Sequence, residues 1–324
     1  MIPNLIKHGS TIRLHVLLGL IIFSVIQPLN AQIQITDSHG KYRFDEPPKR
    51  VVALNWTLVE QMLALGETPV GIANIAGFQK HSIRSEVPDD AVDVGQRLSP
   101  KLSTLRDLKP DVILIGYSQR SLLRPLSNIA TVIYFKNFGR RYNNAEKSRE
   151  RFLEMAKLFD KTELAEQQLA MIDSRLLEMR SQLADTYANK SLPTLQITIP
   201  QTKAEQEKRR PIWLFGNNSL PAYAAEALGL SVISPEETSQ FGTVQLSPDQ
   251  LNTLTTEQAS SICSVSLSNY QTGSIANEAP KANGESADCA FEPAYQSAFG
   301  GVRSVLYLAE AMFEKLVDNA NTKK

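Results

Sequence analysis

The chain has 324 residues, with 34 Lys and Arg against 34 Asp and Glu, so its formal net charge is zero. This balance does not indicate a nucleic-acid or membrane-surface partner. Four histidines and two cysteines are too few to favour a site in which the protein itself ligates a bare transition metal. We therefore expect no resident cofactor, and any metal that the protein handles should arrive already chelated.

The N-terminal segment has the pattern of a secretory signal peptide. Lys7 and Arg13 precede the apolar run 14–26, and Ala31 supplies a small residue at the expected cleavage site. A membrane anchor is the alternative, but the run is shorter than the roughly 20 residues that a spanning helix needs. We therefore expect residues 1–31 to be removed on export.

Short apolar runs alternate with helical patterns in the first part of the mature chain. Residues 51–54, 111–116 and 131–135 have the composition of buried parallel strands. Apolar positions at helical spacing follow Thr57, a residue that can cap a helix. These patterns predict right-handed βαβ units and an α/β lobe over residues 32–142.

A long helical segment follows at residues 143–190. No glycine or proline lies between Gly139 and Pro193, and the apolar positions do not keep a strict heptad. An isolated coiled coil is the alternative, but a helical spine that joins two lobes fits the pattern better.

The remainder of the chain, residues 191–324, has the pattern of a second α/β lobe. Strands are predicted at 194–199 and 212–215, and a helix at 220–228. The chain ends with an amphipathic helical pattern over 300–317. The predicted fold class is thus α/β, with two α/β lobes joined by a long helical spine.

Enzyme signatures are scarce. The sequence Gly116-Tyr117-Ser118 begins like a nucleophile elbow but lacks the closing glycine. Glycine-rich phosphate-binding motifs are absent from the sequence. We therefore expect no enzyme, and the alternative from that class is a hydrolase that uses Ser118 or Ser219 as its nucleophile.

The two cysteines, Cys263 and Cys289, both lie in the mature chain. After export a disulfide between them is the simpler interpretation. Two free thiols are the alternative.

Five segments, in this order, resemble the iron-siderophore periplasmic binding proteins, and within them the ferrichrome-binding branch. They are PPKRVVALNW (47–56), VDVGQR (92–97), LRDLKPDVI (105–113), WLFGNNSL (213–220) and ETSQFG (237–242). The resemblance covers residues 47 to about 254. It implies the helical-backbone periplasmic binding protein fold.

The resemblance also implies a function. It predicts a monomeric periplasmic protein that captures a ferric hydroxamate siderophore and delivers it to an inner-membrane ABC permease. A strongly anionic catecholate complex would call for several basic groups, whereas the matched positions provide Arg97 and mostly aromatics; Arg84, Arg140 and Arg303 could also reach the cleft. The alternatives within the same fold are haem, a corrinoid or a catecholate siderophore, and the alternative of another class is a siderophore-processing hydrolase.

Individual ligand-binding roles follow from the matched positions. Arg97 stands where the family places an arginine that donates to hydroxamate oxygens, and its guanidinium is a rigid fork of donors. Tyr117 supplies a phenol at the end of a strand. Trp56 follows the first strand, where a parallel sheet opens to ligands. Each of the three could instead belong to the surface or the packed core.

The remaining predicted ligand contacts differ from the family pattern. Phe241 replaces a tryptophan, and His81 and Phe299 occupy places near family aromatics. Ser239 could add a hydrogen bond. The usual terminal stretch of the family is not evident after Leu254, which puts the second-lobe contacts in doubt.

Docking to the permease in this family uses an acidic residue on each lobe. Glu226 is the candidate in the second lobe. At the expected first-lobe position the chain has Ser103. Glu60 or Asp107 could substitute, although we interpret both as solvated surface charges.

Overall fold

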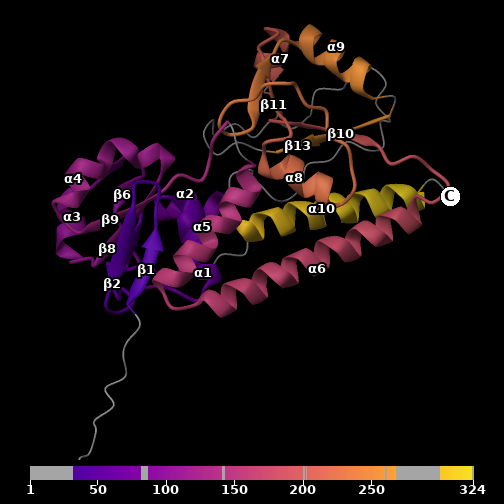
Figure 1. Cartoon of the computed structure of the whole chain (residues 1–324). Coiled ribbons are helices and arrows are strands. Elements are labelled where there is room, and N and C mark those ends of the chain that lie inside the picture. Colours follow the sequence, from indigo (N-terminus) through magenta and orange to yellow (C-terminus); the bar gives the residue numbers. More distant parts are fainter. Residues whose placement is uncertain are drawn as a thin grey trace, which may run out of the picture. The chain divides into compact units, whose positions relative to one another are not determined.

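The computed structural model describes most of residues 32–322 (Figure 1). The described ranges are 32–81, 87–140, 143–199, 201, 203–259, 261–267 and 300–322. The side chains of Lys80, His81, Lys203, Ser266 and Thr322 lie outside the description. The predicted signal peptide, residues 1–31, also lies outside it and remains a prediction.

The first sheet is entirely parallel, with the strand order β5-β4-β3-β8-β9. Its strands are β3 (Val51–Ala53), β4 (Gly71–Ile72), β5 (Val92–Asp93), β8 (Val112–Gly116) and β9 (Thr131–Phe135). All residues of β3 and β8 are buried, because a parallel sheet is covered on both faces and its strands are continuously apolar.

Short helices connect these strands. They are α1 (Trp56–Ala64), α2 (Ile75–His81), α3 (Leu102–Asp107), the 3-10 helix η1 (Tyr117–Leu122) and α4 (Leu123–Ser127). Asn55, not Thr57, caps α1, because its Oδ1 accepts from the amide of Thr57. The sequence interpretation of Thr57 as the cap was wrong by two residues.

Two small hairpins complete the first lobe. The strands β1 (Ile33–Thr36) and β2 (Lys41–Phe44) pair with each other, as do β6 (Gly95–Gln96) and β7 (Ser99–Pro100). The turn between β1 and β2 is attached to β9, because Asp37 accepts from the amide of Tyr134 at 2.8 Å. The sequence interpretation missed the β1–β2 hairpin.

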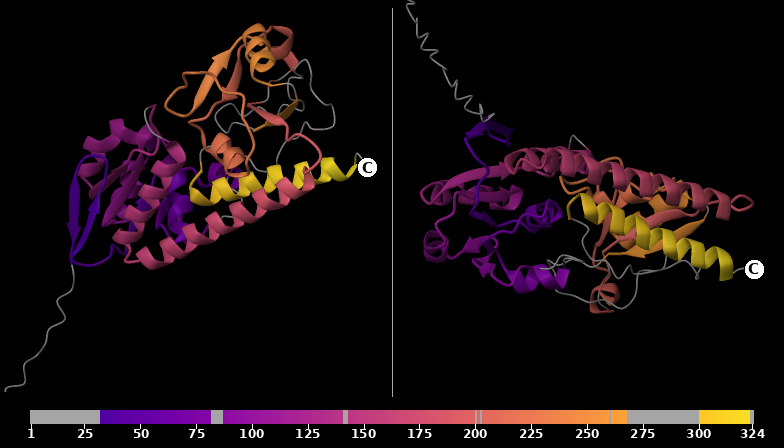
Figure 2. Two further views of the ribbon diagram at one scale, coloured as in Figure 1. Left: turned by 45° about the vertical axis from the view of Figure 1, so that its right-hand side comes forward. Right: turned by 90° about the horizontal axis from the view of Figure 1, so that it is seen from below.

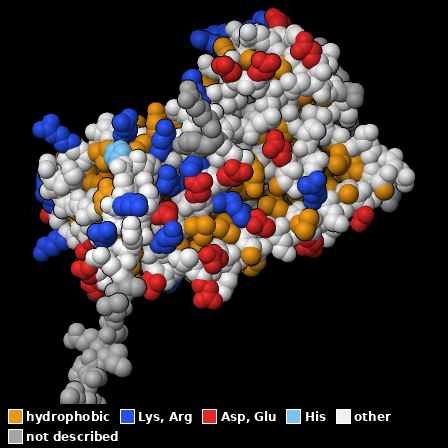
Figure 3. Space-filling view, viewed as in Figure 1, with side chains coloured by type: hydrophobic (Ala, Val, Ile, Leu, Met, Phe, Trp, Pro, Cys, Tyr) orange, Lys and Arg blue, Asp and Glu red, His pale blue; other side chains and the backbone are white. Residues whose placement is uncertain are grey.

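The spine consists of α5 (Asn144–Leu158) and α6 (Thr162–Thr186). The last helix, α10 (Val302–Thr322), lies beside α6 and also contacts α8 and α5 (Figures 1 and 2). Figure 3 shows hydrophobic side chains gathered over this part of the molecule. The helix α10 therefore packs along the spine, although it follows the second lobe in the sequence.

The second sheet is mixed, with the order β12-β11-β10-β13. Its strands are β10 (Thr194–Thr198), β11 (Ile212–Phe215), β12 (Thr243–Leu246) and β13 (Ile262–Ser266). Only β10 and β13 pair in parallel; β11 is antiparallel to both of its neighbours. The helices of this lobe are α7 (Lys203–Glu207), α8 (Leu220–Ala227) and α9 (Pro248–Gln258).

Several details of the second lobe differ from the sequence interpretation. Residues 200–210 have the composition of a charged loop, but the segment contains α7. The apolar pair Val232 and Ile233 is typical of a strand, but the structure has there only a single bridge, between Leu195 and Val232. The edge strand β12 was not predicted, because its alternating, half-buried pattern is only four residues long.

A continuous apolar core joins the two lobes through the spine. One buried cluster includes Phe135 of the first sheet, Leu176 of α6, Leu308 of α10 and Leu195 of the second sheet. The outer faces of the two sheets have separate, smaller clusters. The structure therefore has the predicted class, two α/β lobes on a helical spine, while the residue limits of the lobes remain a prediction.

In the part of the chain that the structure describes, no helix combines the length and the apolar character needed to cross a bilayer.

Candidate ligand-binding site

Two of the predicted ligand residues, Trp56 and Arg97, lie against each other. The guanidinium carbon of Arg97 is 4.1 Å from the centre of the Trp56 ring, a cation–π arrangement. The indole Nε1 donates to the carbonyl of Ala73 at 2.8 Å, which fixes the plane of the ring. A Cβ at position 77 would lie 2.7 Å from Trp56, so Gly77 permits this close approach. Trp56 and Arg97 therefore pack together in a fixed arrangement.

A second group joins the two lobes. Tyr117 of the first lobe and Phe241 of the second are in edge contact, with ring centres 6.3 Å apart. Phe138, from the segment after β9, lies 5.3 Å from Phe241. All three rings are partly or largely buried. The predicted Tyr117 and Phe241 thus belong to one aromatic cluster, and sequence reasoning missed Phe138.

The two groups stand side by side because β3 and β8 are paired neighbours. Trp56 follows β3 and Tyr117 follows β8 directly. The side chain of Asn55 donates to Gln119 Oε1 at 3.3 Å, and the amide of Gly116 donates to the same atom at 3.1 Å. These bonds fix the carboxyl ends of the two strands, which is where open parallel sheets bind ligands.

Phe241 is carried by a tight turn before β12. The Ser239 hydroxyl lies 2.9 Å from the Thr243 hydroxyl and also accepts from the amides of Phe241 and Thr243. Gly242 has φ of 74°, and a Cβ there would lie 2.4 Å from the amide nitrogen of Ser219. The Ser239 hydroxyl is thus used within the turn, and its predicted ligand contact remains untested.

An amide clasp connects this turn to the spine. Asn144, at the start of α5, donates to the carbonyls of Asn218 at 2.7 Å and Gln240 at 3.0 Å. Asn218 in turn donates to the carbonyl of Gly139 at 2.8 Å. These bonds give the second-lobe sequence Asn217-Asn218-Ser219 a structural role: Asn218 holds the lobes together, and Ser219 caps α8.

Glu60 was interpreted as a solvated surface charge, and this is wrong. Its side chain is 6% exposed and lies against the start of α10. Oε1 accepts from the amides of Gly301 and Ser304, at 3.0 and 3.2 Å, and Oε2 accepts from the Ser304 hydroxyl at 2.8 Å. Burial raises the pKa of the Glu60 carboxyl, although these hydrogen bonds oppose the rise. Glu60 is thus no docking candidate.

The second-lobe docking candidate, Glu226, is exposed on α8, and partial burial of its carboxyl raises its pKa. His81 ends α2, but its side chain lies outside the description, as does all of Phe299. Cys263 on β13 is disulfide-bonded, and Cys289 lies outside the described residues. The docking, ligand and pairing roles of these residues therefore remain predictions.

Two residues named above as alternatives, Arg303 and Ser219, make structural contacts. Arg303 donates to the carbonyl of Ala64 at 3.2 Å, so it points into the junction of α1 and α10. Ser219 is 2% exposed, and its hydroxyl accepts from the amide of Ala222. A buried helix cap is a poor nucleophile because its oxygen is already engaged, which weighs against the hydrolase alternative for Ser219.

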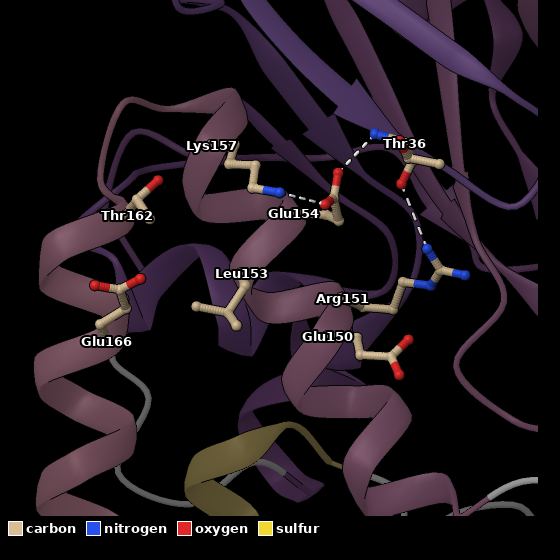
Figure 4. A pocket seen from close by; sticks show the side chains of 8 residues that line it. All are labelled: Thr36, Glu150, Arg151, Leu153, Glu154, Lys157, Thr162 and Glu166. Atoms are coloured by element: carbon tan, nitrogen blue, oxygen red, sulfur yellow. Dashed lines mark hydrogen bonds and ion pairs between the residues drawn. The ribbon is translucent and has the colours of Figure 1, made fainter.

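A pocket of about 460 Å³ lies elsewhere, between β1, α5 and α6 (Figure 4). Glu154 accepts there from the amide of Thr36 at 2.6 Å and pairs with Lys157, while Arg151 donates to the carbonyl of Thr36. None of the predicted ligand residues lines it. Its charged groups attach the first hairpin to the spine, so this pocket is separate from the candidate site.

Two further observations concern charge and metals. Lys136, the first residue after β9, places its Nζ 5.9 Å from the centre of the Tyr117 ring. Sequence reasoning missed it, although its place directly after a predicted parallel strand was a usable signal.

Among the residues that the structure describes, no group of three or more His, Cys, Asp or Glu could hold a metal ion.

A parallel sheet with aromatic and cationic side chains at its strand ends, joined by helices to a second lobe, defines a class of binding protein. The chain belongs to the periplasmic binding protein family, whose model matches residues 51–264. This confirms the family resemblance read from the sequence motifs.

Particular relatives narrow the comparison. A crystal structure of the siderophore-binding protein FhuD from Vibrio cholerae, with bound Fe3+-Desferal, is 30% identical, with a TM-score of 0.69, over 84% of this chain and 98% of that one. The iron(3+)-hydroxamate-binding protein FhuD of Escherichia coli is 29% identical over 63% of this chain and 65% of its own length. The Fe(3+)-citrate-binding protein YfmC of Bacillus subtilis is 30% identical over 46% of this chain and 47% of its own length.

The chain thus matches less than two thirds of the length of these curated relatives. The petrobactin-binding protein YclQ of B. subtilis, at 16% identity and a TM-score of 0.65, shares the fold. The proteins named here are all binding proteins, in agreement with the prediction that the chain is not an enzyme.

Proposed function

We propose that this protein binds a ferric hydroxamate siderophore in the periplasm and delivers it to an inner-membrane ABC permease. The observation that carries the proposal is the stacked pair of Arg97 and Trp56 beside Tyr117 at the strand ends of the first sheet. In this proposal the iron is cargo inside the siderophore, the protein needs no cofactor of its own, and it acts as a monomer.

The chemistry of the pair suits such a ligand. The guanidinium of Arg97 is held 4.1 Å from the centre of the Trp56 ring, and a ferric hydroxamate presents paired oxygens that a guanidinium fork can bind. The hydroxyl of Tyr117 has no hydrogen-bond partner among the described residues and can donate to a further oxygen. The aromatic rings of Tyr117, Phe138 and Phe241 supply apolar surface for the siderophore backbone.

Similarity supports the hydroxamate over other siderophores. Two FhuD proteins match this chain at 30% and 29% identity over 84% and 63% of its length; one has bound Fe3+-Desferal and the other is named for iron(3+)-hydroxamate. A citrate-binding relative matches a shorter stretch, so the ligand class needs a direct test.

The test is a fluorescence titration of the mature protein with ferrichrome, ferrioxamine B, ferric enterobactin and haemin. Trp213 is 37% exposed on β11, so a Trp213→Phe background leaves Trp56 as the only tryptophan reporter. We expect saturable quenching by the hydroxamates, and about 10- to 100-fold weaker binding in Arg97→Ala, since a charge-assisted hydrogen bond contributes about 1.5–3 kcal/mol.

The matched control is Arg106→Ala, which removes an exposed arginine from α3 of the same lobe. It should leave the affinity unchanged. Tighter binding of enterobactin or haemin than of either hydroxamate would contradict the proposed ligand class, and no quenching by any of the four complexes would contradict the proposed function.

A further inference from the structure

Lys136 is a second cation at the candidate site, beside the aromatic cluster. It follows β9, the neighbour of β8 in the sheet, and its Nζ lies 5.9 Å from the centre of the Tyr117 ring. Phe138, two residues further along, contacts Phe241, which contacts Tyr117 in turn. Lys136 therefore borders the same surface that Tyr117 and Phe241 form.

The backbone around Lys136 is fixed. Its amide donates to the Ser38 hydroxyl at 2.7 Å, and the amide of Ser38 donates to the carbonyl of Tyr134 at 2.9 Å. His39 packs on the Tyr134 ring, with centres 4.8 Å apart. The β1–β2 turn thus holds the end of β9, so the position of Lys136 is set by structure and not by a free loop.

Lys136 is half-buried, and among the described residues no carboxylate forms an ion pair with it. Most lysines that form ion pairs in this structure lie on the helices or loops of the surface, for example Lys157 with Glu154. A half-buried, unpaired ammonium beside a binding surface favours an anionic partner, because its desolvation is offset only by an opposite charge.

Two cations at one site change the expected ligand. Arg97 alone suits a near-neutral complex, in which the guanidinium donates to the hydroxamate oxygens. Lys136 follows β9, the strand two positions away from β3 in the sheet order, so the site has a second positive charge for a group outside the iron-binding oxygens. The chemical group that fits is a carboxylate, an acceptor that an ammonium can approach as a point charge.

We infer that Lys136 selects ferric hydroxamate siderophores that carry a free carboxylate in addition to their iron-binding groups. This inference rests on the proposed function, since it assigns a substrate class to the same site. It predicts that the protein ranks ligands with the same iron-hydroxamate core by the charge of their periphery.

The probes are ferrioxamine B, which ends in an ammonium, and its N-acetyl and N-succinyl derivatives, which end in a neutral amide and in a carboxylate. The iron-binding hydroxamates are the same in all three. For the wild-type protein we expect the succinyl form to bind about tenfold more tightly than ferrioxamine B, the size of one partly buried charge contact. In Lys136→Met this ratio should fall to between about one and two.

The matched control is Lys41→Met, which removes an exposed lysine of β2 in the same lobe and changes the net charge equally. It should keep the tenfold ratio. Equal loss of the preference in both variants would attribute it to net charge and overturn the inference, as would an unchanged ratio in Lys136→Met. If the wild-type protein binds none of the three probes, the proposed function itself fails; if it binds all three equally, only the role of Lys136 fails.

Discussion

The two sheets contribute to the candidate site in different ways. The first is all-parallel; Tyr117 and Lys136 directly follow β8 and β9, and Trp56 lies three residues after the end of β3. The second is mixed and contributes Phe241 through a turn before its edge strand β12. A parallel sheet brings its strand ends to one edge by topology alone, whereas the turn of the second lobe needs partners from elsewhere in the chain.

The two lobes differ in where the residues that hold their site side chains come from. The first-lobe residues are held by neighbours in the same sheet, such as Asn55 with Gln119. The turn that carries Phe241 is held by Asn144 of the spine. Each of the following predictions tests how far one region depends on the rest of the molecule.

The largest expected effect concerns Glu60, because it shows that the first lobe also has a distant partner. Glu60→Ala leaves the buried amides of Gly301 and Ser304 without an acceptor, and each such loss costs roughly 1–3 kcal/mol. We expect the free energy of unfolding to fall by about 3 kcal/mol in urea denaturation.

Glu60→Gln is the control for this change. It keeps Oε1 for both amides and places an NH₂ group beside the Ser304 hydroxyl, so the loss should be below about 1 kcal/mol. If both variants lose the same stability, the hydrogen bonds to α10 are not the reason.

The clasp between the spine and the second lobe gives the next effect. Asn144→Ala removes the amide group that donates to Asn218 and Gln240 and the oxygen that accepts from the amide of Gly139, and we expect a loss of about 2–3 kcal/mol, since each hydrogen bond contributes about 1 kcal/mol. Hydrogen exchange should quicken at the amides of Phe241 and Thr243 and stay unchanged in β8.

The neighbouring residue provides a matched control. Asn143 caps α5 by accepting from the amides of Ala145 and Glu146, but it makes no contact in the clasp. Asn143→Ala should cost about 1 kcal/mol without faster exchange at the turn. Faster exchange in both variants would mean that the end of α5, and not the clasp, holds Phe241.

The smallest effect is a pH dependence of stability. Burial raises the pKa of Glu60 above its ordinary value of 4.5, so the folded state binds its proton more tightly than the unfolded state does. The resulting stabilisation is fully present below pH 4.5 and is lost as the pH rises through the raised pKa.

The measurement is the difference in unfolding free energy between wild type and Glu60→Gln as a function of pH. Other carboxyl groups cancel in this difference. We expect it to favour the wild type most at low pH and to decline toward neutral pH; a flat difference would show that the hydrogen bonds of Glu60 balance its desolvation.

Much of the first lobe could be predicted from the sequence, because its signals are local. The apolar runs at β3, β8 and β9 were long enough to identify, and Trp56, Arg97 and Tyr117 lay in motifs around them. Lys136 was missed because a lysine after a strand is usually a surface charge, so its place after β9 was a weak signal without the ring contact with Tyr117.

The rest depended on partners far away in the sequence. Glu60 lies one helical turn after Trp56, and nothing nearby indicates that its acceptor oxygens meet amides 241 and 244 residues further on. The same holds for Asn144 and Asn218, whose amides could have bonded locally. Burial and clasp contacts of this kind are set by tertiary packing, which local patterns do not encode.

The contact between Glu60 and α10 has a consequence for the order in which the molecule is assembled. A chain emerges from synthesis with its N-terminal part first, so α1 is complete long before residues 300–322 appear. Until then the Glu60 carboxylate lacks the amides of Gly301 and Ser304, and the side of α6 that α10 contacts is uncovered. The native joint between the lobes therefore closes only when the last helix arrives, and a chain that ends early cannot complete its first lobe either.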